Sequence, residues 1–284
     1  MTPPLDRLRE RVAALGVPLC VGVDPHPDRL PGGLPRDAAG IEAFASGLVD
    51  ATRDEIVAVK LNVAFFEALG SPGLAALERV RGGIPSELVV IVDAKRGDIG
   101  PTAERYAQAL FGSLGADGVT VSPYLGEDAV EPFVSWPDRL VYVLARTSNP
   151  SARRFQDLEA DGEPIHLRVA RWVADMWPGG RVGLVVGATA AMELERVREL
   201  VPGPPFLIPG IGAQGGDLRA AARAHAGAWG PGLVSVSRGI AEASRGRDWQ
   251  EAAANAVGRL RIELTDAVLH STPTAAPSAE IGGS

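Results

Sequence analysis

The stretch Leu88-Val-Val-Ile-Val92-Asp93-Ala-Lys95-Arg-Gly-Asp98 joins an apolar run to a lysine set between two acids. A short run rich in β-branched residues predicts a strand. Side chains alternate across a strand, so we expect Asp93 and Lys95 to point the same way, with Asp98 just beyond in the following loop. Two unit charges about 4 Å apart attract by roughly 4 kcal/mol at a protein-like effective dielectric, and the acids should therefore keep Lys95 protonated at neutral pH. Such a lysine is suited to donating a proton and poorly suited to forming a Schiff base.

Short apolar runs of this kind alternate with segments of helical spacing along the whole chain. In one such segment the apolar residues are Ile41, Phe44, Ala45, Leu48 and Val49. Eight alternations over about 250 residues predict an α/β fold with a parallel sheet, a (β/α)8 TIM barrel in a single domain. A doubly wound open sheet is the structural alternative. The eight runs are Leu19 to Val23, Ile56 to Leu61, Leu88 to Val92, Gly118 to Val121, Leu140 to Leu144, Val182 to Val186, Phe206 to Ile208 and Leu233 to Val236.

No linker divides the chain, because its Pro/Gly-rich pieces are only as long as loops. We therefore predict one catalytic barrel domain over residues 1–269. Residues 270–284 are small and polar and cannot bury enough apolar area to offset their ordering entropy, so we expect a flexible C-terminal tail. The polar stretch from Arg146 to Pro164, which carries Arg153 and Arg154, is predicted to be a long loop over the site.

Composition excludes several classes of protein. The 284 residues carry a net charge of −7, which argues against general nucleic-acid binding because phosphate backbones need a basic face. No apolar stretch approaches the roughly 20 residues of a membrane span, and no secretory signal is visible, so we expect a cytoplasmic protein without membrane partners. The single Cys20 lies in an apolar run and is expected to be a core residue rather than part of a disulfide or a zinc site.

Polar residues gather where the predicted strands end. Barrel enzymes build their sites at the C-terminal ends of the strands, so these residues are expected to share one rim. A buried structural ion pair would explain Asp93 and Lys95 alone, but it does not explain the coincidence of six clusters. Besides the Asp93 to Asp98 cluster, they are Asp24, Lys60 with Asn62, Thr147-Ser148-Asn149, Gly210-Ile-Gly212-Ala-Gln214-Gly215-Gly216 and Ser237-Arg238-Gly239.

The glycine-rich stretch Gly210-Ile-Gly212-Ala-Gln214-Gly215 formally matches the dinucleotide fingerprint G-x-G-x-x-G. It falls late in the chain and lacks the acid expected about 20 residues further on. Loops after the last two strands of a barrel commonly hold a phosphate, and Arg238 offers a bidentate partner for one. We therefore predict a phosphate site here, with ordinary tight turns as the alternative.

The histidines and Ser148 give no sign of a nucleophilic triad. His166, His225 and His270 show no paired spacing and are expected to be surface or structural residues, whereas His26 is close enough to Asp24 for its role to stay open. Ser148 lacks the G-x-S-x-G context of a nucleophile elbow, so it is expected to hydrogen bond a ligand or cap a turn.

The pattern Asp-x-Lys-x-x-Asp-Ile, with Lys60 and Asp24 on the two preceding predicted strands, resembles the orotidine 5'-phosphate decarboxylase family. The resemblance spans roughly residues 15 to 265, and the motifs together resemble those of the longer bacterial branch of the family. Its motifs are Val59-Lys-Leu-Asn-Val-Ala-Phe-Phe-Glu67, Asp93-Ala-Lys-Arg-Gly-Asp-Ile-Gly100, Arg146-Thr-Ser-Asn-Pro150, Pro209-Gly-Ile-Gly-Ala-Gln-Gly-Gly216 and Ser237-Arg-Gly-Ile240.

The resemblance implies decarboxylation of orotidine 5'-phosphate to uridine 5'-phosphate in pyrimidine biosynthesis, without metal or organic cofactor. It implies a catalytic network of Lys60, Asp93, Lys95 and Asp98, and a homodimer in which Asp98 and Thr102 reach the neighbouring site. Asp24 would bind the ribose with Lys60, Ser148 would recognise the pyrimidine, Gln214 would bridge base and phosphate, and Arg238 with Gly239 would hold the phosphate. The full substrate-binding set that we predict is Asp24, Asn62, Thr102, Ser148, Gly212, Gln214, Arg238 and Gly239.

The expected mechanism follows from the charges. The leaving carboxylate would lie near Asp93, where like charges repel, and Lys95 would protonate the C6 carbanion. One alternative is a magnesium-dependent keto-sugar phosphate decarboxylase of the same superfamily, and another is a non-catalytic barrel that binds a nucleotide phosphate. Lys60, together with Ser148 and Gln214, favours the metal-free pyrimidine reaction.

Overall fold

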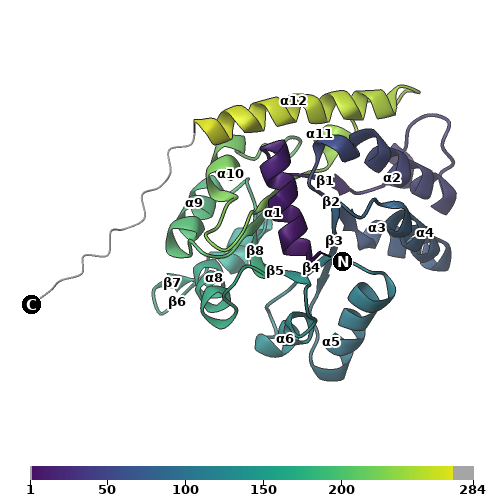
Figure 1. Cartoon of the computed structure of the whole chain (residues 1–284). Coiled ribbons are helices and arrows are strands. Elements are labelled where there is room, and N and C mark those ends of the chain that lie inside the picture. The colour runs from purple at the N-terminus through teal and green to yellow at the C-terminus, as the bar shows by residue number, and fades with distance from the viewer. Residues whose placement is uncertain (1, 271–284) are drawn as a thin grey trace, which may run out of the picture.

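Eight parallel strands close into a barrel in the computed structural model, which describes residues 2–270 (Figure 1). Their order around the barrel is β1-β10-β9-β8-β5-β4-β3-β2, and β1 pairs with β10 to close it. This confirms the predicted (β/α)8 barrel and contradicts the open-sheet alternative. The strands are β1 Leu19–Val23, β2 Ala58–Asn62, β3 Val89–Arg96, β4 Gly118–Val121, β5 Leu140–Arg146, β8 Val182–Val186, β9 Phe206–Pro209 and β10 Leu233–Val236.

Helices surround the barrel on the outside (Figure 1). The predicted tail lies outside the described residues, except for His270. The helices are α1 Pro4–Leu15, α2 Ala38–Thr52, α3 Val63–Glu67, α4 Gly70–Gly83, α5 Gly100–Ala107 with a π-helical continuation over Gln108–Ser113, α6 Glu131–Val134, α7 Arg153–Gln156, α8 Ile165–Met176, α9 Ala191–Leu200, α10 Leu218–Ala224, α11 Arg238–Ala241 and α12 Trp249–Leu269.

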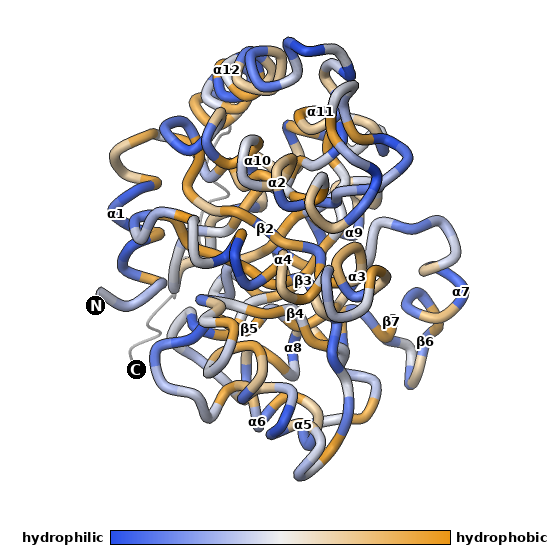
Figure 2. Tube along the Cα trace, turned by 90° about the vertical axis from the view of Figure 1, so that its right-hand side faces the viewer, coloured by the Kyte–Doolittle hydropathy of each residue, from blue (hydrophilic) through white to orange (hydrophobic). Residues whose placement is uncertain are grey.

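The core has two parts because successive strand residues face opposite ways. In β5, Val141 and Val143 belong to the cluster shared with the surrounding helices, whereas Leu140 and Tyr142 belong to a second cluster with Leu8 of α1. Helix α1 therefore covers the end of the barrel at which the strands begin. Figure 2 shows the resulting apolar strands at the centre and hydrophilic loops at the periphery. The opposite end, where the strands finish, is left for polar residues.

The predicted long loop between β5 and α8 has secondary structure of its own. It contains α7 and a two-stranded hairpin of β6 Glu159–Ala160 and β7 Glu163–Pro164. The two residues at the hairpin tip, Asp161 and Gly162, have φ values of 53° and 76°. Positive φ at both central residues is what a type I′ turn requires, and Asp-Gly is among the preferred sequences for it. The segment is thus an ordered part of the rim.

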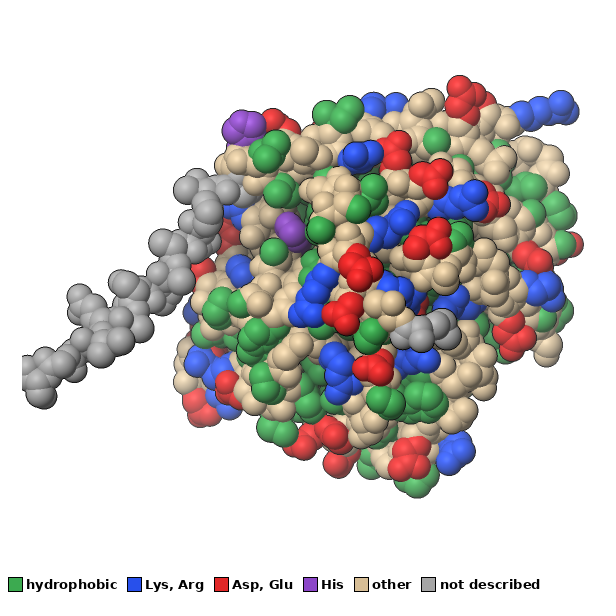
Figure 3. Space-filling model, in the orientation of Figure 1, with side chains coloured by type: hydrophobic (Ala, Val, Ile, Leu, Met, Phe, Trp, Pro, Cys, Tyr) green, Lys and Arg blue, Asp and Glu red, His purple; other side chains and the backbone are tan. Residues whose placement is uncertain are grey.

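Acidic and basic side chains are interspersed over the face on which α1 lies (Figure 3). Several are paired: on α1, Arg9 lies 2.9 Å from Asp6, and Arg7 bonds the buried Asp117. The described part of this face therefore places both signs of charge side by side. Within residues 2–270, no helix combines the length and the apolar character needed to cross a membrane.

Candidate active site

A cavity of about 510 Å³ opens at the C-terminal ends of the strands. The members of the predicted catalytic and substrate-binding sets that line it are Asp24, Lys60, Asn62, Asp93, Lys95, Ser148, Gln214 and Arg238. They come from the ends of β1, β2, β3, β5, β9 and β10, which the barrel brings together although they span more than 200 residues of sequence. The prediction of one shared rim is correct for these eight side chains.

The centre of the cavity is a chain of charges organised around Asp93. One carboxylate oxygen, Oδ2, lies 3.0 Å from the Nζ of Lys60, and the other, Oδ1, lies 2.6 Å from the Nζ of Lys95. Lys60 also lies 4.0 Å from Oδ1 of Asp24. The side chain of Lys60 is only 6% exposed and that of Lys95 is 49% exposed, so Lys60 fixes the carboxylate from below while Lys95 faces the open cavity.

The charges around Asp93 and Lys60 hold these two side chains ionised despite their burial. Burial alone would raise the pKa of the Asp93 carboxyl, but the charges of Lys60 and Lys95 and their hydrogen bonds outweigh it and hold that pKa well below its ordinary value. Burial alone would likewise lower the pKa of Lys60, but the charges of Asp93 and Asp24 outweigh it and raise that pKa. The ionised carboxylate of Asp93 is therefore held, buried, between the side chains of Lys60 and Lys95 at neutral pH.

The backbone at Lys95 is unusual and is supported by the neighbouring strand. Lys95 has φ of 45°, a conformation that is uncommon for a residue other than glycine, and the β3–β4 register shifts between Val92 and Arg96. Thr120 of β4 accepts a hydrogen bond from the N–H of Lys95 at 3.0 Å and donates its hydroxyl hydrogen to Oδ1 of Asp93 at 2.8 Å. Such irregularities re-aim side chains at the ends of strands, and this one directs Lys95 to the cavity.

Asp98 and Thr102 do not line the cavity of their own chain. Oδ1 of Asp98 accepts a hydrogen bond from the N–H of Ile99 at 2.8 Å, and Thr102 is exposed on α5. Within residues 2–270, Asp93 is the acid that pairs with Lys95, so the second acidic neighbour expected for Lys95 is not supplied by Asp98 of the same chain.

The glycine-rich turn after β9 lies beside Arg238. Gly210 and Gly212 have φ values of 105° and 78°, which favour glycine, and Gly210 lines the cavity together with Arg238. Gly212 and Gly239 do not line it, but they are neighbours: a Cβ on Gly212 would lie 3.8 Å from the Cα of Gly239. The turn therefore brings exposed backbone next to a guanidinium, an arrangement suited to an anion.

A second cavity of about 680 Å³ adjoins the first and shares Ser148, Asn149, Gln214 and Arg238 with it. Arg153 of α7 lines this second cavity, and Arg154 does not. Arg146 at the end of β5 lines it as well, so two further arginines share this cavity with Arg238.

Three polar residues of the cavity are not expected from the sequence: Thr120, Gln156 and Ser235. Thr120 and Ser235 are each a hydroxyl in the middle of a short apolar strand, and this pattern is a signal that could have found them. Gln156 carries no local signal, because it reaches the cavity through the return of the β5–α8 segment. His26, whose role the sequence does not decide, lies outside this cavity, and its Nδ1 accepts a hydrogen bond from the N–H of Asp28 at 3.2 Å.

Comparison with known proteins decides the family. The sequence model of the orotidine 5'-phosphate decarboxylase / HUMPS family matches residues 17–254, from just before β1 into α12. The chain belongs to this family. An orotidine 5'-phosphate decarboxylase from Roseiflexus castenholzii is 50% identical to it over 256 residues, which cover 88% of this chain and 93% of that one. Another, from Haloarcula marismortui, is 49% identical over 240 residues, covering 83% of this chain and 85% of that one.

Solved structures of orotidine 5'-phosphate decarboxylases share the barrel. The Leishmania donovani OMP decarboxylase is 36% identical and superimposes with a TM-score of 0.78, covering 92% of this chain and 99% of that one. The resemblance read from Asp93, Lys95 and Asp98 is therefore confirmed at the level of family and fold.

Proposed function

We propose that this chain decarboxylates orotidine 5'-phosphate to uridine 5'-phosphate in pyrimidine biosynthesis, in the cytoplasm and without metal or organic cofactor. The observation that carries the proposal is the carboxylate of Asp93 held between Lys60 and Lys95 in the same cavity as Arg238. A binding protein would not need a lysine salt-bridged to a buried acid at the open side of its cavity. The membership of this chain in the orotidine 5'-phosphate decarboxylase / HUMPS family supports the same reaction.

In the proposed reaction, Asp93 acts before bond cleavage and Lys95 after it. The carboxylate of the substrate is placed against the ionised Asp93, and binding energy from the remote phosphate offsets the repulsion. The bond between C6 and the carboxyl carbon breaks, carbon dioxide leaves, and the electron pair stays on C6. The Lys95 ammonium stabilises that charge and transfers a proton to C6. Lys95 then regains a proton from solvent, which its half-exposed side chain can reach.

The remaining residues of the cavity divide between the other parts of the nucleotide. We assign the ribose to Asp24, Lys60 and Asn62, whose strands β1 and β2 adjoin. We assign the pyrimidine to Ser148 and Gln214, and the phosphate to Arg238 with the backbone at Gly212 and Gly239. This division is supported by the position of the glycine-rich turn and Arg238 on the neighbouring strands β9 and β10.

We further propose a homodimer in which Asp98 and Thr102 complete the site of the neighbouring subunit. Asp98 lies outside its own cavity, and the loops after β3, β4 and β5 each expose an apolar side chain: Ile99 is 50% exposed, Tyr124 73% and Phe155 49%. The rings of Tyr124 and Phe155 are 5.5 Å apart. Clustered apolar exposure next to a polar site supports a protein interface there.

One assay tests the reaction and separates it from the alternatives. Purified protein is incubated with orotidine 5'-phosphate and a chelator while the loss of substrate absorbance and the release of carbon dioxide are followed. Full turnover with chelator present is expected. Turnover that needs added magnesium would favour the metal-dependent mechanism, and binding of uridine 5'-phosphate without turnover of the substrate would favour a non-catalytic barrel.

A further inference from the structure

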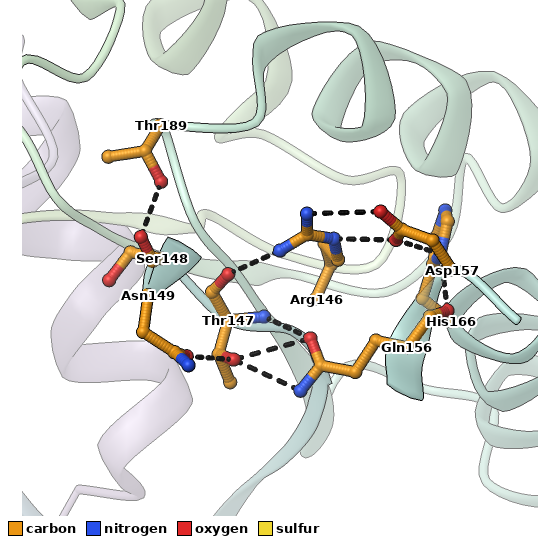
Figure 4. Close-up of polar contacts among 8 residues, drawn as sticks. All are labelled: Arg146, Thr147, Ser148, Asn149, Gln156, Asp157, His166 and Thr189. Atoms are coloured by element: carbon orange, nitrogen blue, oxygen red, sulfur yellow. Dashed lines mark hydrogen bonds and ion pairs between the residues drawn. The ribbon is translucent and has the colours of Figure 1, made fainter. Parts of the chain in front are cut away.

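Thr147 and Ser148, which follow β5, are held in place by hydrogen bonds from neighbouring side chains (Figure 4). The Gln156 Oε1 accepts a hydrogen bond from the N–H of Thr147 at 2.8 Å, and the Gln156 Nε2 donates to the Thr147 hydroxyl at 3.0 Å. Arg146 donates to the carbonyl oxygen of Thr147 at 2.7 Å. Both polar groups of the Thr147 backbone are therefore fixed by side chains.

The next residue, Ser148, is fixed by its backbone while its side chain stays available. Its carbonyl oxygen accepts a hydrogen bond from the hydroxyl of Thr189 at 2.9 Å. The Ser148 hydroxyl takes no hydrogen bond from residues 2–270, and Ser148 lines both cavities. The segment thus presents an unpaired hydroxyl on a rigid backbone, as recognition of a ligand edge requires.

Asp157 and His166 in turn hold the residues that hold Thr147. The carboxylate of Asp157 accepts hydrogen bonds from Nε of Arg146 at 2.8 Å and from its Nη2 at 3.2 Å. This is a bidentate ion pair with an arginine that is only 7% exposed. The Nδ1 of the buried His166 lies 2.9 Å from the carbonyl oxygen of Gln156 and 3.3 Å from Oδ1 of Asp157. Neither Asp157 nor His166 lines either cavity.

The two contacts of His166 identify its protonated nitrogen. Both neighbours of Nδ1 are oxygen acceptors, so Nδ1 carries the hydrogen. Nε2 is buried and has no partner within the described chain. The structural contribution of His166 is therefore one hydrogen-bond donor at the Nδ1 position, directed at Gln156 and Asp157.

We propose that Asp157 and His166 are positioning residues for pyrimidine recognition. They hold Arg146 and Gln156, which hold the Thr147 backbone, and so they set the position of the Ser148 hydroxyl against the base. This inference rests on the proposed function, because it assumes that a pyrimidine nucleotide occupies the cavity. It predicts that loosening the network weakens contacts to the base and leaves contacts to ribose and phosphate unchanged.

The experiment compares two polar replacements of the same histidine. In His166→Asn the side-chain amide can occupy the place of Nδ1 and keep the donor, whereas in His166→Gln the amide extends toward the place of Nε2 and loses it. Binding of uridine 5'-phosphate and of ribose 5-phosphate, which lacks the base, is measured by titration calorimetry on the full chain, with thermal unfolding measured in parallel. We expect about tenfold weaker uridine 5'-phosphate binding in His166→Gln, near-normal binding in His166→Asn, and unchanged ribose 5-phosphate binding in both.

Asp157→Asn is a second variant, since Asp157 is 29% exposed and its replacement preserves size while removing one acceptor for Arg146. It is expected to behave as His166→Gln does, so the test survives if His166→Gln fails to fold. His225→Asn is a control for replacing a buried histidine away from the cavity, and its binding of both ligands should stay unchanged.

Equal binding of uridine 5'-phosphate by the wild type, His166→Gln and Asp157→Asn would overturn the positioning role, as would an equal loss for both ligands. Failure of the wild type to bind uridine 5'-phosphate at all would instead contradict the proposed function, so the two failures are distinguishable.

Discussion

Thr120 donates its hydroxyl hydrogen to the same carboxylate oxygen of Asp93 that receives the Lys95 ammonium, from a neighbouring strand and at 2.8 Å. Because it also accepts from the N–H of Lys95, this one hydroxyl ties the acid to the left-handed backbone of the lysine. Side-chain and backbone geometry of the charged centre are therefore set together.

Thr120→Val removes that hydroxyl with little change of shape. We expect kcat to fall by about tenfold to a hundredfold, because Asp93 and Lys95 lose their common anchor, and the free energy of unfolding to fall by about 1 kcal/mol. Steady-state kinetics and urea denaturation measure the two effects. Thr265→Val on α12, which removes a hydroxyl bonded to the Arg261 carbonyl oxygen, is the matched control and should leave kcat unchanged.

Lys95→Ala should abolish turnover while uridine 5'-phosphate still binds. The substitution removes the proposed proton donor but leaves the Lys60–Asp93 pair and Arg238 in place. Single-turnover assays and product titration measure the two properties. Near-normal decarboxylation by this variant would contradict the proposed mechanism.

Mixing two inactive variants tests whether Asp98 acts across a dimer. In a hybrid of Lys95→Ala and Asp98→Ala subunits, one site combines an intact Lys95 with an intact Asp98 from the partner. Random mixing then gives about a quarter of wild-type activity, because about half of the dimers are hybrids with one working site each. The variants are mixed, dissociated in mild denaturant and refolded together before assay. An unchanged, near-zero rate after verified exchange would place Asp98 in the chemistry of its own subunit.

His225 predicts a pH dependence of stability. Burial, with a smaller effect of the Arg198 charge, lowers the pKa of this imidazole from 6.5 to about 4. Between these values the unfolded chain binds a proton that the folded chain does not, so stability is full above pH 6.5 and falls as the pH drops toward 4, by about 3 kcal/mol. Denaturation midpoints across this range measure the slope. His225→Leu should flatten it, and a slope equal to that of the wild type would show that other groups cause it.

Gly187→Ala tests the close packing behind Ser148. A Cβ at Gly187 would lie 2.8 Å from the Cα of Ser148 and 2.9 Å from its N, so the backbone must move. We expect a loss of about 1–3 kcal/mol in unfolding free energy and weaker uridine 5'-phosphate binding. Gly258→Ala in α12, where nothing lies within 4 Å of the added Cβ, is the control and should stabilise the chain by about 0.5–1 kcal/mol.

The strands were predictable because β-branched side chains are restricted in a helix and pack well on a pleated sheet. All eight predicted runs overlap the observed strands, and the largest difference lies at the end of β3, which continues to Arg96; β5 likewise continues past its predicted end to Arg146. These extensions carry polar residues, so their strand character comes from pairing with the neighbouring strands rather than from local propensity. The shared rim was predictable for a topological reason, since parallel strands of a barrel all finish at one end.

The positions of Gln156 and Asp98 could not be predicted from the sequence, because they depend on how separate segments of the folded chain lie relative to one another. Gln156 meets Thr147 only because the short turn Pro150–Ala152 and α7 bring the chain back, and no local sequence signal marks that return. Asp98 lies outside the cavity of its own chain, and the spacing within the motif alone does not indicate this position.

The closing pair of strands gives the ligand a further effect. Asp24 follows β1 and Arg238 follows β10, and these are the first and last strands of the barrel, joined side by side. A nucleotide held by both residues would link the ends of β1 and β10. A barrel in which these two strands have separated could not bind it. Nucleotide binding should therefore protect the amides of β1 and β10 from hydrogen exchange, and the substrate would act as a folding cofactor of the enzyme that consumes it.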